Sequence, residues 1–217
     1  HLTVGDAARS CAIIAASGCV PLVRVPINST EHIKRVLDTG AWGVVVPMVN
    51  SRAEAQAVVN AARYRPLGQR SIGGQLPALN FGTDAATYYE RANDEVLVVV
   101  MAEHVDAVGR IDEILSVPGI DVVFVGPNDL HASYGVAPAF ESDLPEFNQA
   151  LARILASAKA HGVVPGIHVA NAAQAQRRIA EGWRFVAISS EAGLLLTYTR
   201  GIVETLGLKS ARAGIKY

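Results

Sequence analysis

The chain has 217 residues, half of them hydrophobic, and a formal net charge of -1. This length suits one large domain, and the near-neutral charge argues against a nucleic-acid or acidic-membrane partner. No apolar run reaches the ~20 residues that a membrane-spanning helix needs. Cys11 and Cys19 lack metal-ligand spacing, so we interpret them as reduced packing residues. We therefore expect a single cytoplasmic domain over residues 1–217.

Helical and strand patterns alternate along the chain. Apolar periodicity, capping residues and glycine stops mark the helices, and short β-branched runs mark the strands. The predicted helices are 4–16, 28–37 (with its cap at 28–30), 51–63, 103–115, 144–160, 172–181 and 191–206. The predicted strands are 21–25, 43–46, 96–100, 122–125, 165–169 and 185–188.

This alternation predicts parallel βαβ units and an α/β fold. A closed barrel is favoured over a doubly wound sheet, because no glycine-rich dinucleotide turn follows any strand. The pattern contains roughly six strands where a TIM-type (β/α)8 barrel has eight. We therefore expect a TIM-type barrel that lacks its N-terminal strands in this chain. A six-stranded open sheet is the alternative.

The main irregular segment spans 64–95. It carries "LNFGTDAATYYERAND", and the second half of this run predicts a short helix. The "SIGG" run at 71–74 could cradle an anion with backbone N–H groups, but a plain turn is the better interpretation.

Two carboxylates follow consecutive predicted strands. Glu103 comes just after the 96–100 strand, and Asp129 follows the 122–125 strand in "VVFVGPND". Neighbouring parallel strands lie about 4.8 Å apart, so both side chains could reach one ion. Two hard oxygen ligands indicate a Mg²⁺ or Mn²⁺ site. Alternatively, Glu103 begins a helix and Asp129 caps the next one.

Arg24 ends the first predicted strand, "PLVRV". A guanidinium within an apolar strand is costly unless it is paired or directed at a ligand. It could stabilise an enolate oxygen or bind a carboxylate, and a buried ion pair with Asp38 or Glu103 is the alternative.

Other residue types provide weaker indications. No lysine lies at a strand end, so Schiff-base catalysis has no candidate nucleophile. His104, His131 and His168 could line the mouth of the barrel, although a single histidine is more often structural.

Two long stretches resemble the HpcH/HpaI aldolase family, and the similarity extends over essentially the whole chain. They are "GAWGVVVPMVNSRAEAQAVVNAARYRPLGQRSIGG" and "GIDVVFVGPNDLHASYG". The resemblance implies a class II, metal-dependent pyruvate aldolase, which is a carbon–carbon lyase with the barrel fold of the phosphoenolpyruvate/pyruvate superfamily. It also implies a divalent metal such as Mg²⁺, Mn²⁺ or Co²⁺. Oxo-acid and aldehyde substrates are expected, in a hexamer whose subunits exchange the helix within 190–206.

Individual roles follow from the same resemblance. Glu103 and Asp129 match the metal ligands, and Arg24 matches the arginine that stabilises the enolate. Asp38 matches an acid that raises the basicity of the catalytic histidine. The turn that contacts the oxo-acid carboxylate corresponds to Gly126, Pro127 and Asn128.

The sequence departs from the family pattern at two places. The metal strand of the family ends Gln-x-Glu with the glutamine reaching substrate, and here Met101 replaces that glutamine. The catalytic histidine of the family falls just before His1 by register.

We therefore expect an enzyme that makes or cleaves 4-hydroxy-2-oxo acids through a pyruvate enolate. The alternatives are an oxaloacetate decarboxylase or citrate-lyase-like acyl-CoA lyase, and a catalytically impaired barrel that binds oxo acids.

Overall fold

The computed structural model describes residues 2–208 of the chain. The strands are β1 (Leu22–Arg24), β2 (Gly43–Val46), β3 (Leu97–Met101), β4 (Val122–Val125), β5 (Val164–Val169) and β6 (Phe185–Ile188). The helices of the first half are α1 (Val4–Ala16), α2 (Thr30–Asp38), α3 (Arg52–Ala62), α4 (Leu76–Asn80) and α5 (Ala85–Glu95). They are followed by α6 (Val105–Gly109), α7 (Ile111–Leu115), α8 (Pro127–Ser133), α9 (Pro145–His161), α10 (Ala172–Glu181) and α11 (Glu191–Thr205).

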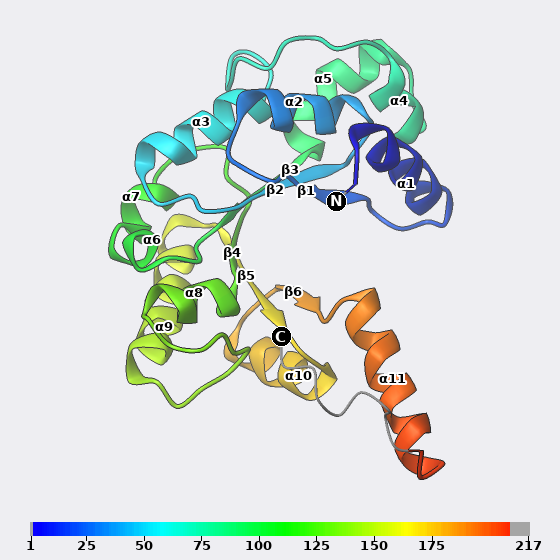
Figure 1. The fold of residues 1–217 in the computed structure, drawn as a ribbon. Helices are drawn as coiled ribbons and strands as arrows, with labels where there is room; N and C mark the ends of the chain where they lie inside the picture. Colours follow the sequence, from blue (N-terminus) through cyan, green and yellow to red (C-terminus); the bar gives the residue numbers. More distant parts are fainter. Residues whose placement is uncertain (1, 209–217) are drawn as a thin grey trace.

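The six strands form one parallel sheet in chain order, β1-β2-β3-β4-β5-β6. In a doubly wound sheet the strand order reverses at a switch point, whereas in a barrel each strand joins the side of the one before it. The sheet curls, and most helices cover its convex side (Figure 1). The predicted α/β class is confirmed as a partial TIM-type barrel.

Side-chain alternation gives the sheet two different faces. The convex face contributes Val98, Val100 and Val123 to the main core beneath the helices. The concave face carries a second, smaller apolar cluster built around Val99, Met101, Val122 and Phe124. Met101 therefore points to the hollow side of the sheet.

The predicted helix over 103–115 is wrong in its bounds. It is two short helices, α6 and α7, separated at Arg110, whose φ of -115° and ψ of 20° are not helical. The His104 side chain caps α6 by accepting the N–H of Asp106 at 3.2 Å. Glu103 therefore lies outside the helix, between β3 and the cap of α6.

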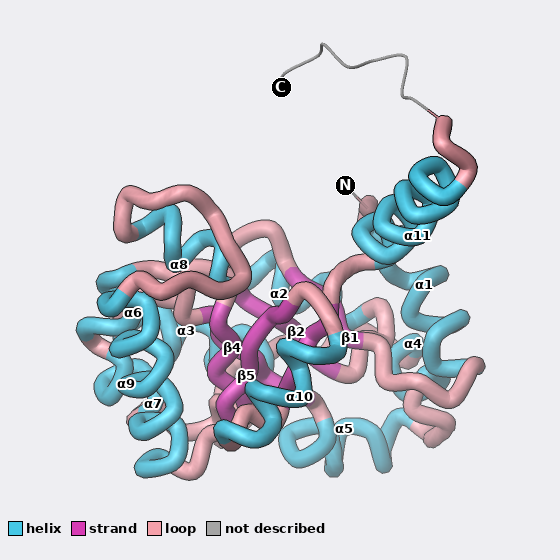
Figure 2. Tube along the Cα trace, turned by 90° about the horizontal axis from the view of Figure 1, so that it is seen from below, coloured by secondary structure: helices cyan, strands magenta, loops and turns pink. Residues whose placement is uncertain are grey.

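The segment over 64–95 is more regular than the sequence indicates. Its second half is helical as predicted, as α5, but α4 was not predicted. Figure 2 shows both helices beside the N-terminal half of the sheet. Cys11 is buried and Cys19 is exposed, so the packing role holds for Cys11 alone, and both cysteines are free. Within residues 2–208, no helix has the length and apolar character that crossing a bilayer requires.

Candidate active site

A pocket of about 460 Å³ opens at the C-terminal ends of the strands, on the concave side of the sheet. It brings together six of the eight predicted site residues. These are Arg24, Met101, Gly126, Pro127, Asn128 and Asp129. They come from β1, β3, and the N-cap and first turn of α8, which are brought together because parallel strands end at the same edge.

Glu103 lies buried beside this pocket and is only 2% exposed. Its Oε1 accepts the backbone N–H of Met48 at 2.9 Å. Its Oε2 is buried and has no hydrogen-bond partner among the described residues. Burial raises the pKa of Glu103, and the negative charge of Asp129 adds to this shift, while the Met48 N–H and the Arg24 charge oppose it. An orphaned buried carboxylate oxygen is costly unless a ligand satisfies it.

The surroundings of Glu103 fit a divalent cation. Gly126 has no side chain, and a Cβ there would lie 2.5 Å from Glu103 Oε2. Asp129 is exposed in the first turn of α8, and its charge is close enough to affect the pKa of Glu103. Two carboxylates that differ in burial, with one free buried oxygen, are a suitable donor set for a hard metal ion. The alternative role of Asp129 as a helix cap is wrong, because Gly126 occupies the N-cap of α8.

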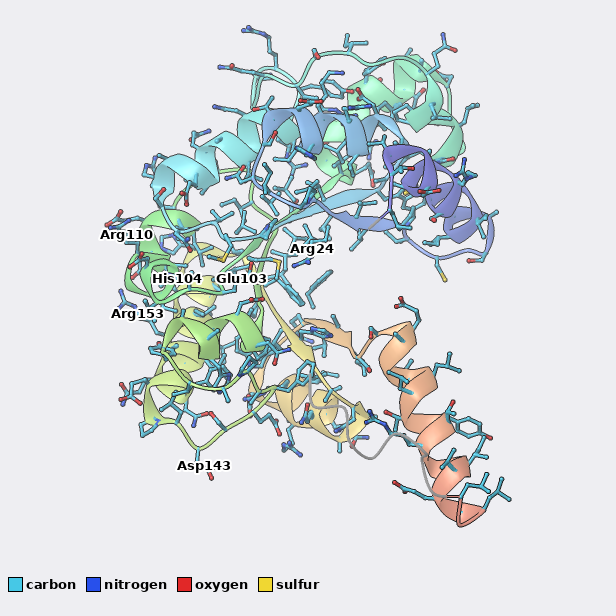
Figure 3. All side chains as sticks on the ribbon, in the orientation of Figure 1. Arg24, Glu103, His104, Arg110, Asp143 and Arg153 are labelled. Atoms are coloured by element: carbon cyan, nitrogen blue, oxygen red, sulfur yellow. The ribbon has the colours of Figure 1, made fainter. Side chains whose placement is uncertain are left out.

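Arg24 is the last residue of β1 and is exposed at the pocket. Figure 3 shows Arg24 and Glu103 near the hollow side of the sheet, whereas Arg110, between α6 and α7, and Arg153, on α9, lie on the outer side. Among the described residues, Arg24 forms no salt bridge. The alternative of a buried ion pair is therefore wrong, and the guanidinium is free to meet a ligand.

Asp38 does not join this cluster. It is the last residue of α2, which returns from the C-terminal end of β1 to the N-terminal end of β2. Its carboxylate pairs with Lys34 at 2.6 Å and with the fully buried Arg70 at 3.1 Å. Asp38 thus lies toward the N-terminal ends of the strands, whereas the pocket lies at their C-terminal ends. Its role beside a catalytic histidine stays a prediction.

The three candidate histidines have different surroundings. His104 caps α6, and His131 is buried between the carbonyl of Pro127 (2.7 Å) and the hydroxyl of Ser142 (2.6 Å). Only His168, on β5, lines the pocket.

Met48 is a site residue that the sequence did not indicate. Its backbone has a φ of 54°, which is uncommon for a residue other than glycine. This conformation accompanies the hydrogen bond from its N–H to Glu103. Local patterns do not reveal it, because the bond links residues 55 positions apart. The only local indication of this role is Pro47, which comes between the buried strand β2 and Met48.

Comparison with known proteins agrees with this geometry. The model of the HpcH/HpaI aldolase/citrate lyase family matches residues 2–197. The chain belongs to this family. A partial barrel with two carboxylates and an arginine at its strand ends is thus the scaffold of an aldolase-type carbon–carbon lyase, which confirms the predicted enzyme class.

Individual relatives support the same assignment. The hydroxypyruvate/pyruvate aldolase of Rhizorhabdus wittichii is 37% identical over 92% of this chain and 78% of its own length. The 5-keto-4-deoxy-D-glucarate aldolase of Shigella dysenteriae is 34% identical over 88% of this chain and 74% of its own length. The crystal structure of an HpcH/HpaI aldolase from Desulfitobacterium hafniense superposes with a TM-score of 0.88 at 30% identity, covering 99% of this chain and 82% of that one.

Proposed function

We propose that this chain forms and cleaves 4-hydroxy-2-oxo acids through the enolate of pyruvate, at a divalent cation held by Glu103 and Asp129. The observation that carries the proposal is the orphaned Oε2 of Glu103, buried beside a pocket that also contains Arg24 and Asp129. A bound divalent cation supplies positive charge that lowers the energy of an enolate oxygen.

The residues of the chain would supply the remaining interactions. Arg24 would donate hydrogen bonds to the oxygen on which negative charge develops as a methyl proton leaves pyruvate. The resulting carbon nucleophile forms a bond with an aldehyde carbon, whose oxygen takes up a proton to become the 4-hydroxyl. Cleavage is the reverse reaction. The turn of Gly126, Pro127 and Asn128 lines the pocket where the oxo-acid carboxylate would lie.

The expected partners are small molecules and further copies of the chain, in the cytoplasm. Helix α11 supports an oligomer, because none of its residues is buried. Leu194, Leu195 and Tyr198 are 61%, 68% and 72% exposed. Apolar exposure of this extent along one helix is typical of an interface. We propose that a neighbouring subunit covers α11.

Deuterium exchange into the methyl group of pyruvate tests the function without any aldehyde. We expect exchange in the parent protein with Mg²⁺ or Mn²⁺, and its loss after chelation. Glu103→Gln and Asp129→Asn should lower exchange by at least about 10²-fold, the usual effect of removing charge stabilisation from an active site.

Glu113→Gln is the matched control, because this glutamate is exposed on α7 away from the pocket. Full exchange in Glu103→Gln after metal is restored would disprove the proposed site. Metal binding by the parent without any exchange would instead indicate the impaired, oxo-acid-binding alternative that Met101 suggests.

A further inference from the structure

We propose that His168 sets the preference for the second substrate, by accepting a hydrogen bond from a hydroxyl group next to the aldehyde carbonyl. The inference rests on the proposed aldol function and names the acceptor class, 2-hydroxyaldehydes. It concerns the part of the pocket built by β5 and β6, which follow β4 in the sheet.

This part of the pocket is mostly apolar. Phe124, Phe185 and Ala187 line it together with His168 and Ser189. The side chain of His168 is thus the one ring in the pocket lining that carries hydrogen-bonding atoms. An aldehyde substrate with a hydroxyl group finds few other side chains among these residues that could form a hydrogen bond with it.

One nitrogen of the His168 ring is already committed. Nε2 lies 3.0 Å from the backbone carbonyl oxygen of Ser189. A carbonyl oxygen accepts only, so Nε2 carries the proton. In the neutral imidazole the other nitrogen is then an acceptor. Nδ1 has no hydrogen-bond partner among residues 2–208, so it remains available to a hydroxyl donor.

The His168 ring has three neighbours that restrict its position. Phe140 meets it edge to face, with ring centroids 5.1 Å apart. Phe124 lies on another side at 6.5 Å. Ser189 has a φ of 55°, which is rare for a residue other than glycine and accompanies the contact of its carbonyl with Nε2. A ring with so few degrees of freedom presents Nδ1 in one orientation.

The bond to a hydroxyl would favour a hydroxylated aldehyde over the corresponding unsubstituted one. His168 is half-buried, and a site disfavours a substrate that leaves such a hydrogen-bonding group without its partner. Enolisation of pyruvate is proposed to depend on Glu103, Asp129 and Arg24, so the loss of the bond to His168 should lower aldol rates more than it lowers exchange.

Two amide variants separate the two nitrogens of the ring. Glutamine extends its amide to the region of Nε2, so His168→Gln keeps a donor to Ser189 and loses the acceptor at Nδ1. Asparagine places its amide near Nδ1, so His168→Asn keeps that acceptor. His168→Leu loses both. His161→Leu, on α9 outside the pocket, is the control.

The measurement is the ratio of kcat/KM for glycolaldehyde to that for acetaldehyde, which differ by one hydroxyl, with pyruvate methyl exchange recorded in parallel. We expect His168→Gln and His168→Leu to lower the ratio by roughly 3- to 10-fold, the effect of one lost hydrogen bond. The ratio should fall by a larger factor than exchange does in these two variants, and His161→Leu should keep both at the parental values. His168→Asn should retain most of the ratio.

An unchanged ratio in both His168→Gln and His168→Leu would overturn the inference and leave the proposed function intact. A loss of exchange equal to the loss of aldol rate would also overturn it, because His168 would then act on enolisation. Absence of exchange in the parent protein would overturn the proposed function and this inference together.

Discussion

Replacement of Arg24 should affect catalysis and leave folding intact. Because it is exposed and forms no salt bridge among the described residues, its replacement should not destabilise the fold. We expect Arg24→Lys to fold and bind metal but to exchange pyruvate methyl protons about 10²–10³-fold more slowly, the usual cost of a lost oxyanion donor. Lysine keeps the charge and loses the planar two-pronged donor.

Thermal unfolding and metal titration would accompany the exchange measurement. Arg153→Lys, on the outer helices (Figure 3), is the matched control. Exchange by Arg24→Lys at the parental rate, with metal bound in both proteins, would show that Arg24 has no part in enolisation.

Met101 stands where the family resemblance implies a glutamine that contacts substrate. It is 4% exposed and lines the pocket from the end of β3. We expect Met101→Gln to lower the KM for pyruvate several-fold, because a new hydrogen bond contributes about 0.5–1.5 kcal/mol. The same amide would lack a partner without ligand, so the melting temperature should fall. An unchanged or higher KM would indicate a site adapted to another substrate.

The junction between β4 and α8 brings Asp129 close to Glu103. Gly126 has a φ of -95°, so alanine can adopt its backbone conformation. The added methyl would meet Glu103 Oε2 at 2.5 Å and Met101 Cε at 3.3 Å. We expect Gly126→Ala to fold but to weaken metal binding at least about ten-fold, because a displaced carboxylate no longer fits the ion.

Isothermal titration with Mn²⁺ would measure this effect. Gly109→Ala is the control, because a Cβ at this residue of α6 would meet nothing within 4 Å. Parental affinity in Gly126→Ala would mean that the carboxylate relaxes without harm, or that the metal lies elsewhere.

Helix α11 is the element through which the whole molecule is expected to assemble with further copies. Helix α11 projects from the rest of the fold in two views turned by 90° (Figures 1 and 2) and carries apolar side chains that this chain leaves exposed. We expect Leu195→Asp to shift the protein toward single chains in sedimentation velocity, because a charge is costly in an apolar interface. Arg200→Gln on the same helix should leave the assembly intact. A parent protein that sediments as a single chain would refute the exchanged helix.

The sequence by itself determined the six strands and most of the helices, the parallel fold class and the strand ends at which the site lies. These follow from local signals. Periodicity, caps and β-branched runs depend on near neighbours, and the carboxyl ends of parallel strands necessarily meet at one edge. Glu103, Asp129 and Arg24 could therefore be chosen from their places after or at the ends of strands.

The tertiary structure decided the burial and the partners of these residues. Glu103 is buried beside Met48 and Gly126, and its Oε2 has no hydrogen-bond partner among the described residues. Arg24 is exposed, and Asp38 pairs with Arg70. Burial and pairing depend on contacts between segments far apart in the chain, 55 positions apart for Met48 and Glu103. No local pattern encodes such contacts, since they exist only once the strands have come together.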